Sequence, residues 1–329
     1  MIKTVLVGYG YWAPNLLRVA NNNKHIKIVA VLDIDKKKKK KVPNGIKFFD
    51  CYEKLTKDIV FDAVIIATPV LDHFVTASFF LELNKHVFVE KPLAKTSMEC
   101  NKLIKLSSSK KLVLMVGHLY LYNNYIKEIK KLIDQNNCGN LMYIYCDRLN
   151  LGRVQSEVNV LWSLAPHDIS IINYFLNSKP TEIKAEGFSA LRNNVEDLVH
   201  VKLKYKNNIY CFLNLSWHDP EKVRKIKLIF SKKMIIFDDV KTQKKLEIID
   251  ISGSRVDDFM KSPESFEEFQ FNSKNKKSFF PSIKEKEPLQ EEINHFVDCI
   301  VKSKTPKSNG YNGLNVVKTL EDIEKNLSN

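Results

Sequence analysis

One glycine-containing turn near the amino terminus constrains the fold of this chain more than any other feature. The segment VGYGYWAPN at residues 7–15 follows a short apolar run, Thr4–Val7, and leads into a helix-like pattern. Gly8 and Gly10 permit a tight turn and the close approach of a pyrophosphate, while Ala13 stands where a small residue lets helix and strand pack together. The segment therefore predicts a dinucleotide-binding turn between a strand and a helix.

The residue that ends the next apolar run supports this interpretation. The run IKIVAVL begins at Ile26 and is followed by Asp33, roughly 20 residues beyond Gly10, where dinucleotide-binding folds carry an acid. A carboxylate there accepts hydrogen bonds from the ribose hydroxyls of NAD and repels the additional phosphate of NADP. An ordinary turn with a surface aspartate is the alternative. The order strand, turn, helix, strand and acid favours an NAD site.

The order of apolar runs predicts an α/β chain with two domains. Strand-like runs that alternate with helix-like stretches are typical of a parallel sheet with right-handed crossovers. The strand-like runs are Thr4–Val7, Ile28–Leu32, Ala63–Ala67, His86–Val89 and Leu112–Val116, and the helix-like stretches include His73–Leu83 and Cys100–Ser107. From Met142 onward the segments are longer and alternate in polarity, which favours an antiparallel or mixed sheet with one face in solvent.

We therefore expect a Rossmann-type domain over residues 1–118 and an α+β domain with a large open, mainly antiparallel sheet over residues 119–329. A length of 329 residues agrees with two domains, because one core rarely grows beyond roughly 250–300 residues. In the second domain, helices are expected at Trp162–Leu176, Leu289–Val301 and Gly313–Leu327. The charged, poorly periodic segment Asp257–Pro288 is predicted to be a long loop.

Composition excludes several classes of protein. The net charge is +14, but the excess is scattered, and the one dense block, Lys36–Lys41, follows a strand and is interpreted as a solvated face. No aromatic stacking platform or helix-turn-helix pattern accompanies the charge, so nucleic acid is not an expected partner. No apolar run approaches the roughly 18 residues that span a bilayer, and the amino terminus lacks the pattern of a signal peptide, so a cytoplasmic protein is expected. Six cysteines without CxxC spacing predict neither a disulfide nor a structural metal.

Three further segments give the chain a resemblance to a known family. Besides the turn at residues 7–15, they are IIATP at 65–69, VEKPLA at 89–94 and VGHLYLYN at 116–123. The chain resembles the Gfo/Idh/MocA oxidoreductases over nearly its whole length. RLNLGRVQSEVNVLW at 148–162, LAPHDIS at 164–170 and SWHDPEKVRKI at 216–226 make its second half most similar to the UDP-N-acetylglucosaminuronate 3-dehydrogenases, enzymes of polysaccharide biosynthesis. The resemblance assigns cofactor binding to Gly8, Gly10, Tyr11, Trp12, Ala13, Asp33, Thr68, Pro69, His73, Glu90 and Lys91.

Lys91 and His167 are the candidate catalytic residues. In the family the peptide bond before the proline of the EKP segment is commonly cis, which implies that Lys91 points into the cleft. Alone, EKP would indicate a surface lysine at a strand end, but it follows IIATP at the family's distance. Relatives place a histidine at position 167 on the first helix of the second domain, facing the nicotinamide, and imidazole suits proton removal near neutral pH.

One departure from the family pattern lies four residues before this histidine. Many relatives carry aspartate there, on the same helix face, whereas this chain has Ser163. A hydroxyl orients an imidazole but does not raise its basicity as a carboxylate does. Asp168 is no simple substitute, because adjacent helix positions point about 100° apart. A weaker enzyme, a rearranged site and a binding protein without chemistry remain open.

The resemblance implies substrate contacts from Arg153, Asn159, Trp162, His167 and Tyr122. Arginine matches a carboxylate or phosphate in a bidentate manner, whereas Trp162 is equally well explained as a core residue. Trp217, Lys222 and Arg224 are further candidates, with a strand bearing exposed cations as the alternative. Tyr122 and Asn123 are expected to line the cleft between the domains.

The resulting hypothesis is NAD-dependent oxidation of a secondary hydroxyl, at C3, of a nucleotide-linked sugar such as UDP-N-acetylglucosaminuronate. A dehydrogenase or reductase acting on a free sugar, polyol or ketosugar is the first alternative, and a non-catalytic nucleotide-binding paralogue is the second. The resemblance further implies a homodimer or homotetramer packed through the outer face of the second-domain sheet. Alternating apolar residues in VHVKLKY and LEIIDI agree with such packing, although core packing gives the same pattern.

Overall fold

The chain folds into two compact units. A computed structural model describes residues 1–152, 154, 158–251 and 277–328. Unit 1 comprises Met1–Asn123 together with Lys286–Glu321, and unit 2 comprises Asn124–Glu285 together with Asp322–Asn329. The sequence pattern predicts a single domain boundary, after residue 118. In the structure the first unit ends at Asn123, and the chain comes back to it at Lys286. Periodicity marks the helices of this returning segment but does not say which core they cover.

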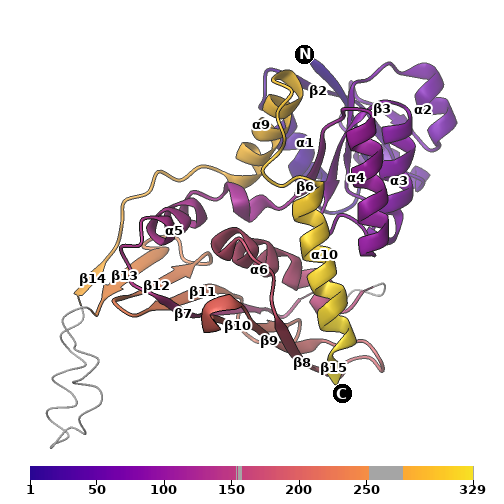
Figure 1. Ribbon diagram of the computed structural model, residues 1–329. Helices are drawn as coiled ribbons and strands as arrows, with labels where there is room; N and C mark the ends of the chain where they lie inside the picture. The colour runs from indigo at the N-terminus through magenta and orange to yellow at the C-terminus, as the bar shows by residue number, and fades with distance from the viewer. Residues whose placement is uncertain (153, 155–157, 252–276, 329) are drawn as a thin grey trace, which may run out of the picture. The chain divides into compact units, whose positions relative to one another are not determined.

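Unit 1 is built on a six-stranded parallel sheet. Its order is β3-β2-β1-β4-β5-β6, that of a dinucleotide-binding fold (Figure 1). The strands are β1 (Ile2–Val7), β2 (Ile26–Leu32), β3 (Lys47–Phe49), β4 (Ala63–Ile66), β5 (His86–Glu90) and β6 (Leu114–Gly117). All four residues of β4 are buried, as expected for a strand with helices on both faces of its sheet. The expected Rossmann-type sheet is confirmed.

Helices cover the two faces of this sheet. They are α1 (Ala13–Asn21), α2 (Tyr52–Asp58), α3 (Val70–Glu82), α4 (Ser97–Ser109) and α9 (Pro288–Val301), with the first part of α10 (Gly310–Lys325). The 3-10 helices η1 (Lys36–Lys41) and η2 (Leu119–Tyr122) follow β2 and β6. Helix α1 packs against α9, and α3 packs against α4 on the opposite side of the sheet (Figure 1). The glycine turn therefore lies at the amino end of a helix that is fixed from both sides.

Unit 2 contains a nine-stranded mixed sheet. Its order is β14-β13-β12-β11-β7-β10-β9-β8-β15, and the pairs β7–β10 and β8–β15 are parallel while the others are antiparallel. The strands are β7 (Leu141–Leu149), β8 (Glu182–Phe188), β9 (Leu198–Lys204), β10 (Tyr210–Ser216), β11 (Val223–Phe230), β12 (Lys233–Asp238), β13 (Leu246–Asp250), β14 (Lys277–Phe279) and β15 (Leu327–Ser328), with the 3-10 helix η3 (Lys206–Asn208) before β10. The expected α+β domain with an open, mainly antiparallel sheet is confirmed.

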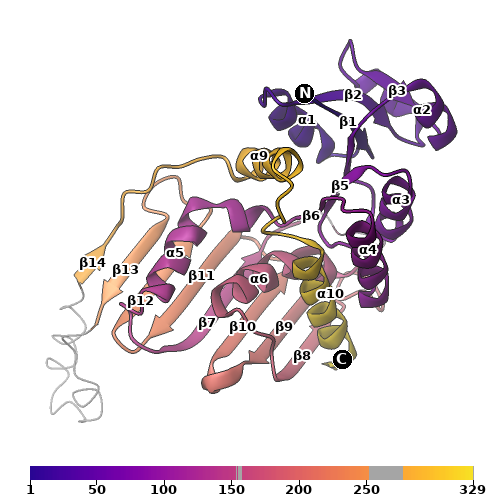
Figure 2. The same cartoon turned by 45° about the horizontal axis from the view of Figure 1, so that its top comes forward.

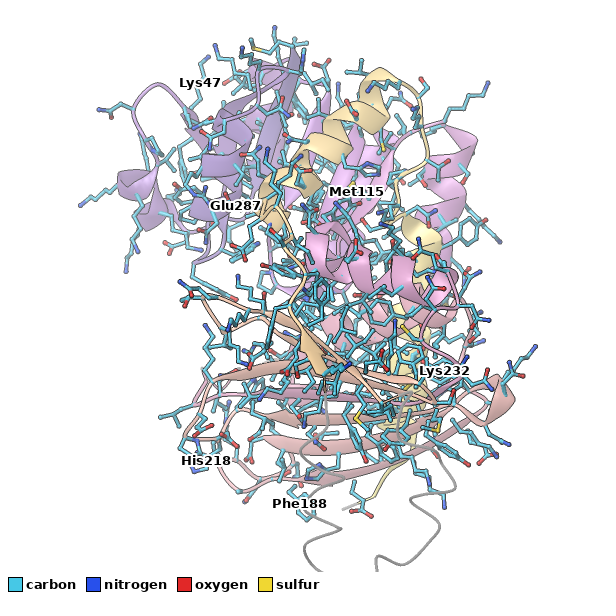
Figure 3. The ribbon with its side chains drawn as sticks, turned by 90° about the vertical axis from the view of Figure 1, so that its left-hand side faces the viewer. Lys47, Met115, Phe188, His218, Lys232 and Glu287 are labelled. Carbon is cyan, nitrogen blue, oxygen red and sulfur yellow. The ribbon has the colours of Figure 1, made fainter. Side chains whose placement is uncertain are left out.

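The two faces of the second sheet differ in what covers them. Helices α5 (Asn124–Asp134) and α6 (Val160–Leu176) lie on one face (Figure 2). On β7, Ile144 and Cys146 are buried, whereas Tyr145 points to the other face and stacks on Phe212 with ring centroids 5.0 Å apart. Phe188, half exposed, lies on that same face, away from the helices (Figure 3). The outer face is therefore partly aromatic.

The predicted long loop at residues 257–288 lies mostly outside the described residues. Where it is described, the prediction is wrong at two points: Lys277–Phe279 forms strand β14 beside β13, and α9 begins at Pro288. No described helix is long and apolar enough to cross a membrane. All six cysteines are free, and five of them are buried.

Candidate active site

The turn after β1 requires glycine at residue 8. Gly8 has φ +85°, and a Cβ on it would lie 2.8 Å from backbone atoms of Ala67 and Thr68, which follow β4. The turn is therefore pressed against the end of the neighbouring strand, at the point where the strand order of the sheet reverses. Open α/β sheets bind ligands outside the carboxyl ends of the strands at such a point. A Cβ on Gly10, in contrast, would meet nothing within 4 Å.

The residues around this turn fit a dinucleotide pyrophosphate. Helix α1 begins at the fully buried Ala13, and no side chain caps its start. Pro14 has no amide hydrogen and the Asn15 amide donates to the Trp12 carbonyl oxygen at 3.0 Å, which leaves the Ala13 amide and the positive end of the helix dipole to interact with an anion. The hydroxyl of Thr68 is buried and has no hydrogen-bond partner among the described residues. Tyr11 is 79% exposed beside the turn, and Pro69 is exposed at the start of α3. Open space at Gly10, the uncapped start of α1 and an unpaired hydroxyl together match a phosphate ligand.

Asp33 lies at the carboxyl end of β2 and is buried. Its Oδ2 accepts a hydrogen bond from the Tyr9 amide at 2.6 Å, and its Oδ1 accepts one from the Asp35 amide at 2.9 Å. The ammonium group of Lys38 lies 3.0 Å from Oδ2. The carboxylate is thus held rigidly at the position where the motif places a ribose acceptor.

His73 connects two segments of the site. Its Nδ1 lies 2.7 Å from the Pro92 carbonyl oxygen and its Nε2 lies 2.9 Å from the Thr68 carbonyl oxygen. Burial lowers the pKa of this imidazole, although the two carbonyl groups oppose that shift. A neutral ring has one N–H and donates to one carbonyl at a time. His73 therefore positions the loops after β4 and β5, and its ring nitrogens face backbone atoms.

The EKP segment follows directly from β5. The Lys91–Pro92 peptide bond is cis, as the resemblance implies. Glu90 accepts a hydrogen bond from the Trp12 indole at 2.7 Å, which ties this segment to the glycine turn. Burial raises the pKa of Glu90, while the nearby charge of Lys91 lowers it. Unit 1 thus brings Trp12, Glu90 and Lys91 to one edge of its sheet.

His118 is a candidate that the sequence reasoning missed, although it lies within the VGHLYLYN segment. The residue is fully buried after β6, and neither ring nitrogen has a hydrogen-bond partner in the part of the chain that the structure describes. Burial, assisted by the charge of Lys91, lowers the pKa of His118 to about 3, so the ring is neutral. A neutral imidazole offers one donor and one acceptor to a ligand beside Lys91.

Tyr122 is buried within unit 1. Its hydroxyl lies 2.9 Å from the Ser308 hydroxyl, and burial followed by the charge of Glu292 raises its pKa. This contact joins η2 to the segment before α10. The hydroxyl expected to touch substrate is therefore engaged inside its own unit.

In unit 2, Asn159 and Trp162 form the start of α6. The side-chain oxygen of Asn159 caps the helix by accepting from the Trp162 amide at 3.2 Å, and its Nδ2 donates to Glu196 at 2.7 Å. Trp162 is 2% exposed and donates its indole N–H to Glu324 at 2.7 Å. These contacts agree with the core alternative for Trp162. Arg153 lies outside the described residues.

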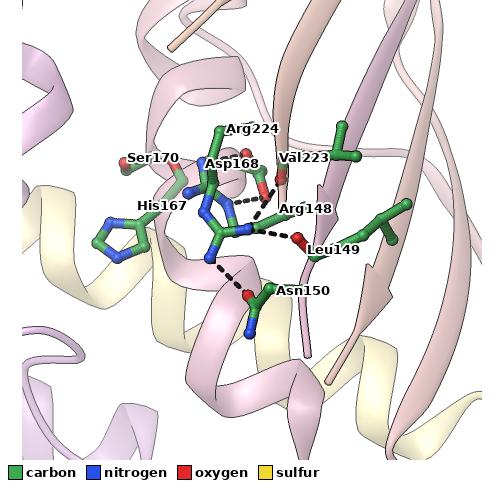
Figure 4. Close-up of polar contacts among 8 residues, drawn as sticks. All are labelled: Arg148, Leu149, Asn150, His167, Asp168, Ser170, Val223 and Arg224. Carbon is green, nitrogen blue, oxygen red and sulfur yellow. Dashed lines mark hydrogen bonds and ion pairs between the residues drawn. The ribbon is translucent and has the colours of Figure 1, made fainter. Parts of the chain in front are cut away.

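Ser163, His167 and Asp168 lie in the first half of α6. His167 is half-buried, Ser163 lies one turn before it, and Asp168 is nearly fully buried. Asp168 forms a bidentate ion pair with Arg148 of β7, in which Nε and Nη2 each donate over 2.7 Å. Figure 4 shows the His167 ring pointing away from this pair. Asp168 therefore serves the contact of α6 with the sheet.

Arg224 extends this polar cluster along the strand edge. It lies opposite Arg148 in the β7–β11 register and donates to the carbonyl oxygens of Leu149 and Val223 and to the Asn150 side chain, over 2.6–3.0 Å (Figure 4). Trp217 is 2% exposed, whereas Lys222 is exposed. Arg224 thus organises the chain just after β7, next to the residues that the sequence reasoning proposed for substrate contact.

Comparisons with known proteins agree with this organisation. The Gfo/Idh/MocA model, described as an oxidoreductase family with an NAD-binding Rossmann fold, matches residues 2–118, and the model of the Gfo/Idh/MocA C-terminal domain matches residues 126–236. The solved structure of UDP-N-acetylglucosamine 3-dehydrogenase from Acidithiobacillus ferrooxidans superposes with a TM-score of 0.82 at 18% identity, over 99% of this chain and 97% of that chain.

Curated relatives match this chain over shorter stretches. The same Acidithiobacillus enzyme is 26% identical over 136 residues, 41% of this chain and 42% of its own length. Inositol 2-dehydrogenase from Salmonella typhimurium is 26% identical, over 56% of this chain and 57% of its own length. The 2,7-anhydro-N-acetylneuraminate hydratase of Mediterraneibacter gnavus is 24% identical, over 67% of this chain and 64% of its own length. Each alignment spans less than two thirds of the relative.

Both family models fall on the two units described above, and together they match most of the chain. The glycine turn and Asp33 lie where the dinucleotide-binding motif has its glycines and its acid. The chain belongs to the Gfo/Idh/MocA family of oxidoreductases, and its first unit is the NAD-binding Rossmann fold of that family.

Proposed function

We propose that the protein oxidises a secondary hydroxyl, at C3, of a nucleotide-linked sugar such as UDP-N-acetylglucosaminuronate, with NAD as the oxidant. The observation that carries the proposal is the edge of the first sheet, where Lys91 follows a glutamate bonded to the glycine turn. A lysine there lies next to the residues that bind the dinucleotide. The substrate class rests on likeness to an enzyme named UDP-N-acetylglucosamine 3-dehydrogenase.

Oxidation of a secondary alcohol to a ketone removes one hydride and one proton. Bound NAD supplies the hydride acceptor. A side chain of this protein must accept the hydroxyl proton. We assign this role to Lys91 or His167, because an amine or an imidazole accepts a hydroxyl proton near neutral pH. Gly8, Thr68 and Asp33 hold the dinucleotide, while the neutral His118 offers a further hydrogen bond beside Lys91. Holding the hydroxyl in line with its base raises the reaction rate, because the entropic cost of bringing the two groups together is met when the substrate binds.

A polyol or free sugar is the second candidate substrate. The likeness to inositol 2-dehydrogenase supports it, since inositol carries secondary hydroxyls without a nucleotide. Both candidates place the same demands on Lys91 and on the dinucleotide site. They differ in whether the nucleotide part of the substrate contributes binding.

Purified protein with NAD is incubated with four substrates: UDP-N-acetylglucosaminuronate, UDP-N-acetylglucosamine, free N-acetylglucosaminuronate and inositol. The expected result is NADH formation, or a sugar product lighter by two hydrogens in mass spectrometry, with the UDP-linked uronate and a far smaller rate with the free sugars. Turnover of inositol and none with the UDP sugars would move the protein to the second candidate. No product from the UDP sugars at saturation would reject the proposal.

The role of Lys91 has its own test. Lys91→Ala is expected to lower kcat by a factor on the order of 10²–10⁴, the usual contribution of one general base, while the dissociation constant of NAD changes little. Lys105→Ala, which removes an exposed lysine from α4, is the matched control and should leave both quantities unchanged. Equal kcat in the two variants would refute the assignment.

A further inference from the structure

The Lys36–Lys41 run forms a 3-10 helix directly after Asp33 and Asp35. Asp35 caps it, because its side chain accepts a hydrogen bond from the Lys37 amide at 3.0 Å. Within η1, five lysines are exposed and Lys38 is half-buried. The run therefore does more than form a solvated face, since one of its members turns back toward the sheet.

Lys38 neutralises the acid that ends β2. Its ammonium nitrogen lies 3.0 Å from Oδ2 of Asp33, and the two side chains are 31% and 5% exposed. The same oxygen accepts the Tyr9 amide, and the other oxygen accepts the Asp35 amide. Two backbone amides fix the carboxylate, whereas the long lysine side chain is flexible and partly in solvent. In this pair the lysine is the partner that is free to move.

This ion pair reduces the electrostatic repulsion between Asp33 and the 2′-phosphate of NADP. An uncompensated carboxylate at the ribose position excludes NADP, because its charge repels the 2′-phosphate. With an ammonium group 3.0 Å away, the charge of the pair is close to zero. A lysine is also a good phosphate ligand, since its ammonium binds as a compact point charge. Five more lysines of the same short helix add a positive field around this position.

We propose that the protein binds NADP as well as NAD, and that the ammonium group of Lys38 binds the 2′-phosphate of NADP while it stays beside the Asp33 carboxylate. The contacts at the adenosine end of the site then differ between the two cofactors. With NAD, Asp33 accepts the ribose hydroxyls, and with NADP, the ammonium of Lys38 lies between the phosphate and the carboxylate. This inference rests on the proposed function only in requiring that unit 1 binds a pyridine dinucleotide.

The test is calorimetric titration of the full-length protein with NAD and with NADP, without substrate. In the wild type, the two dissociation constants are expected to lie within about tenfold of each other. Lys38→Gln should weaken NADP binding by about tenfold, the loss of one charge-assisted contact to phosphate, and should change NAD binding less than about twofold. Higher salt should weaken NADP binding more than NAD binding, because the added phosphate contact is largely in solvent.

Lys41→Gln is the matched control, since it removes the same charge from the same helix at an exposed position. It is expected to change the ratio of the two dissociation constants by less than about twofold, because a field from an exposed charge is screened. NADP binding more than about 100-fold weaker than NAD binding in the wild type would overturn the inference. Equal shifts of the ratio in the two variants would also overturn it. Absence of heat with both nucleotides would refute the proposed function itself, which is a distinct result.

Discussion

The bidentate pair between Arg148 and Asp168 is expected to be the most sensitive polar contact of unit 2. Its two hydrogen bonds are 2.7 Å long, and the side chains are 5% and 2% exposed. Removing one partner leaves a buried charge without compensation, which typically costs about 3–5 kcal/mol of unfolding free energy. We therefore expect Arg148→Met and Asp168→Leu each to destabilise the protein by about that amount.

Combining the two substitutions should restore much of the lost stability. Met and Leu bury apolar surface where the pair was buried, and replacing a whole buried ion pair by apolar residues is often neutral or stabilising. The double variant is therefore expected to be more stable than either single variant. Such a coupling is expected for a buried charge pair, because each single variant leaves one charge unpaired and the double variant leaves none.

Urea unfolding followed by tryptophan fluorescence measures these changes. The chain has three tryptophans, and Trp12→Phe leaves Trp162 and Trp217, which both lie in unit 2. The surface pair between Lys204 and Glu182 provides the control, since Glu182→Gln removes one partner of an exposed ion pair and should hardly shift the midpoint. A loss below about 1 kcal/mol in both single variants, or a double variant less stable than either, would refute the reasoning.

Three further changes give separate outcomes. Ser163→Asp should raise turnover severalfold near pH 7, because a carboxylate one turn before His167 increases the basicity of the ring; unchanged kcat in pH-rate profiles would count against that base. Burial, followed by the charge of Glu90, raises the pKa of Glu292, whose carboxyl oxygens have no partner among the described residues. Its protonated form therefore stabilises the fold at low pH, and this stability is lost as pH rises above the unfolded pKa near 4.5. Glu292→Gln should remove that slope in urea titrations from pH 4 to 8, whereas Glu291→Gln should retain it. We also propose that copies of the chain associate through the aromatic outer face of the second sheet, so Tyr145→Lys should lower the mass measured by light scattering.

Local patterns were sufficient for the glycine turn and for five of the six strands of the first sheet, whereas the three-residue strand β3 was not predicted. The glycine turn, Ala13 and Asp33 are close in sequence, and their roles follow from backbone geometry that few other residues permit. The apolar runs of β1 and β5 are recognisable for the same reason, since each is short and buried on both faces. Predicted ends still differ by a few residues, as at α4, where the capping box of Thr96 and Glu99 starts the helix before the predicted Cys100.

Long-range pairing explains what the sequence did not reveal. The returning segment at residues 286–321 carries an ordinary amphipathic pattern, and nothing local indicates that its helix α9 covers α1 rather than the second sheet. Likewise, Arg148 and Asp168 are ordinary residues of a strand and a helix until the sheet brings them together. His118 was overlooked because burial, which makes it neutral, is a property of the fold.

The charges of three carboxylates show why function requires this tertiary information. In the sequence, Asp33, Asp168 and Glu292 are all acids near apolar segments. In the structure, Asp33 is compensated by the movable Lys38 and Asp168 by the fixed Arg148, whereas Glu292 is buried without a partner among the described residues, and burial raises its pKa. Because a movable partner can also bind a ligand and a fixed one cannot, we infer that the acid of Asp33 tunes cofactor choice while that of Asp168 supports the fold.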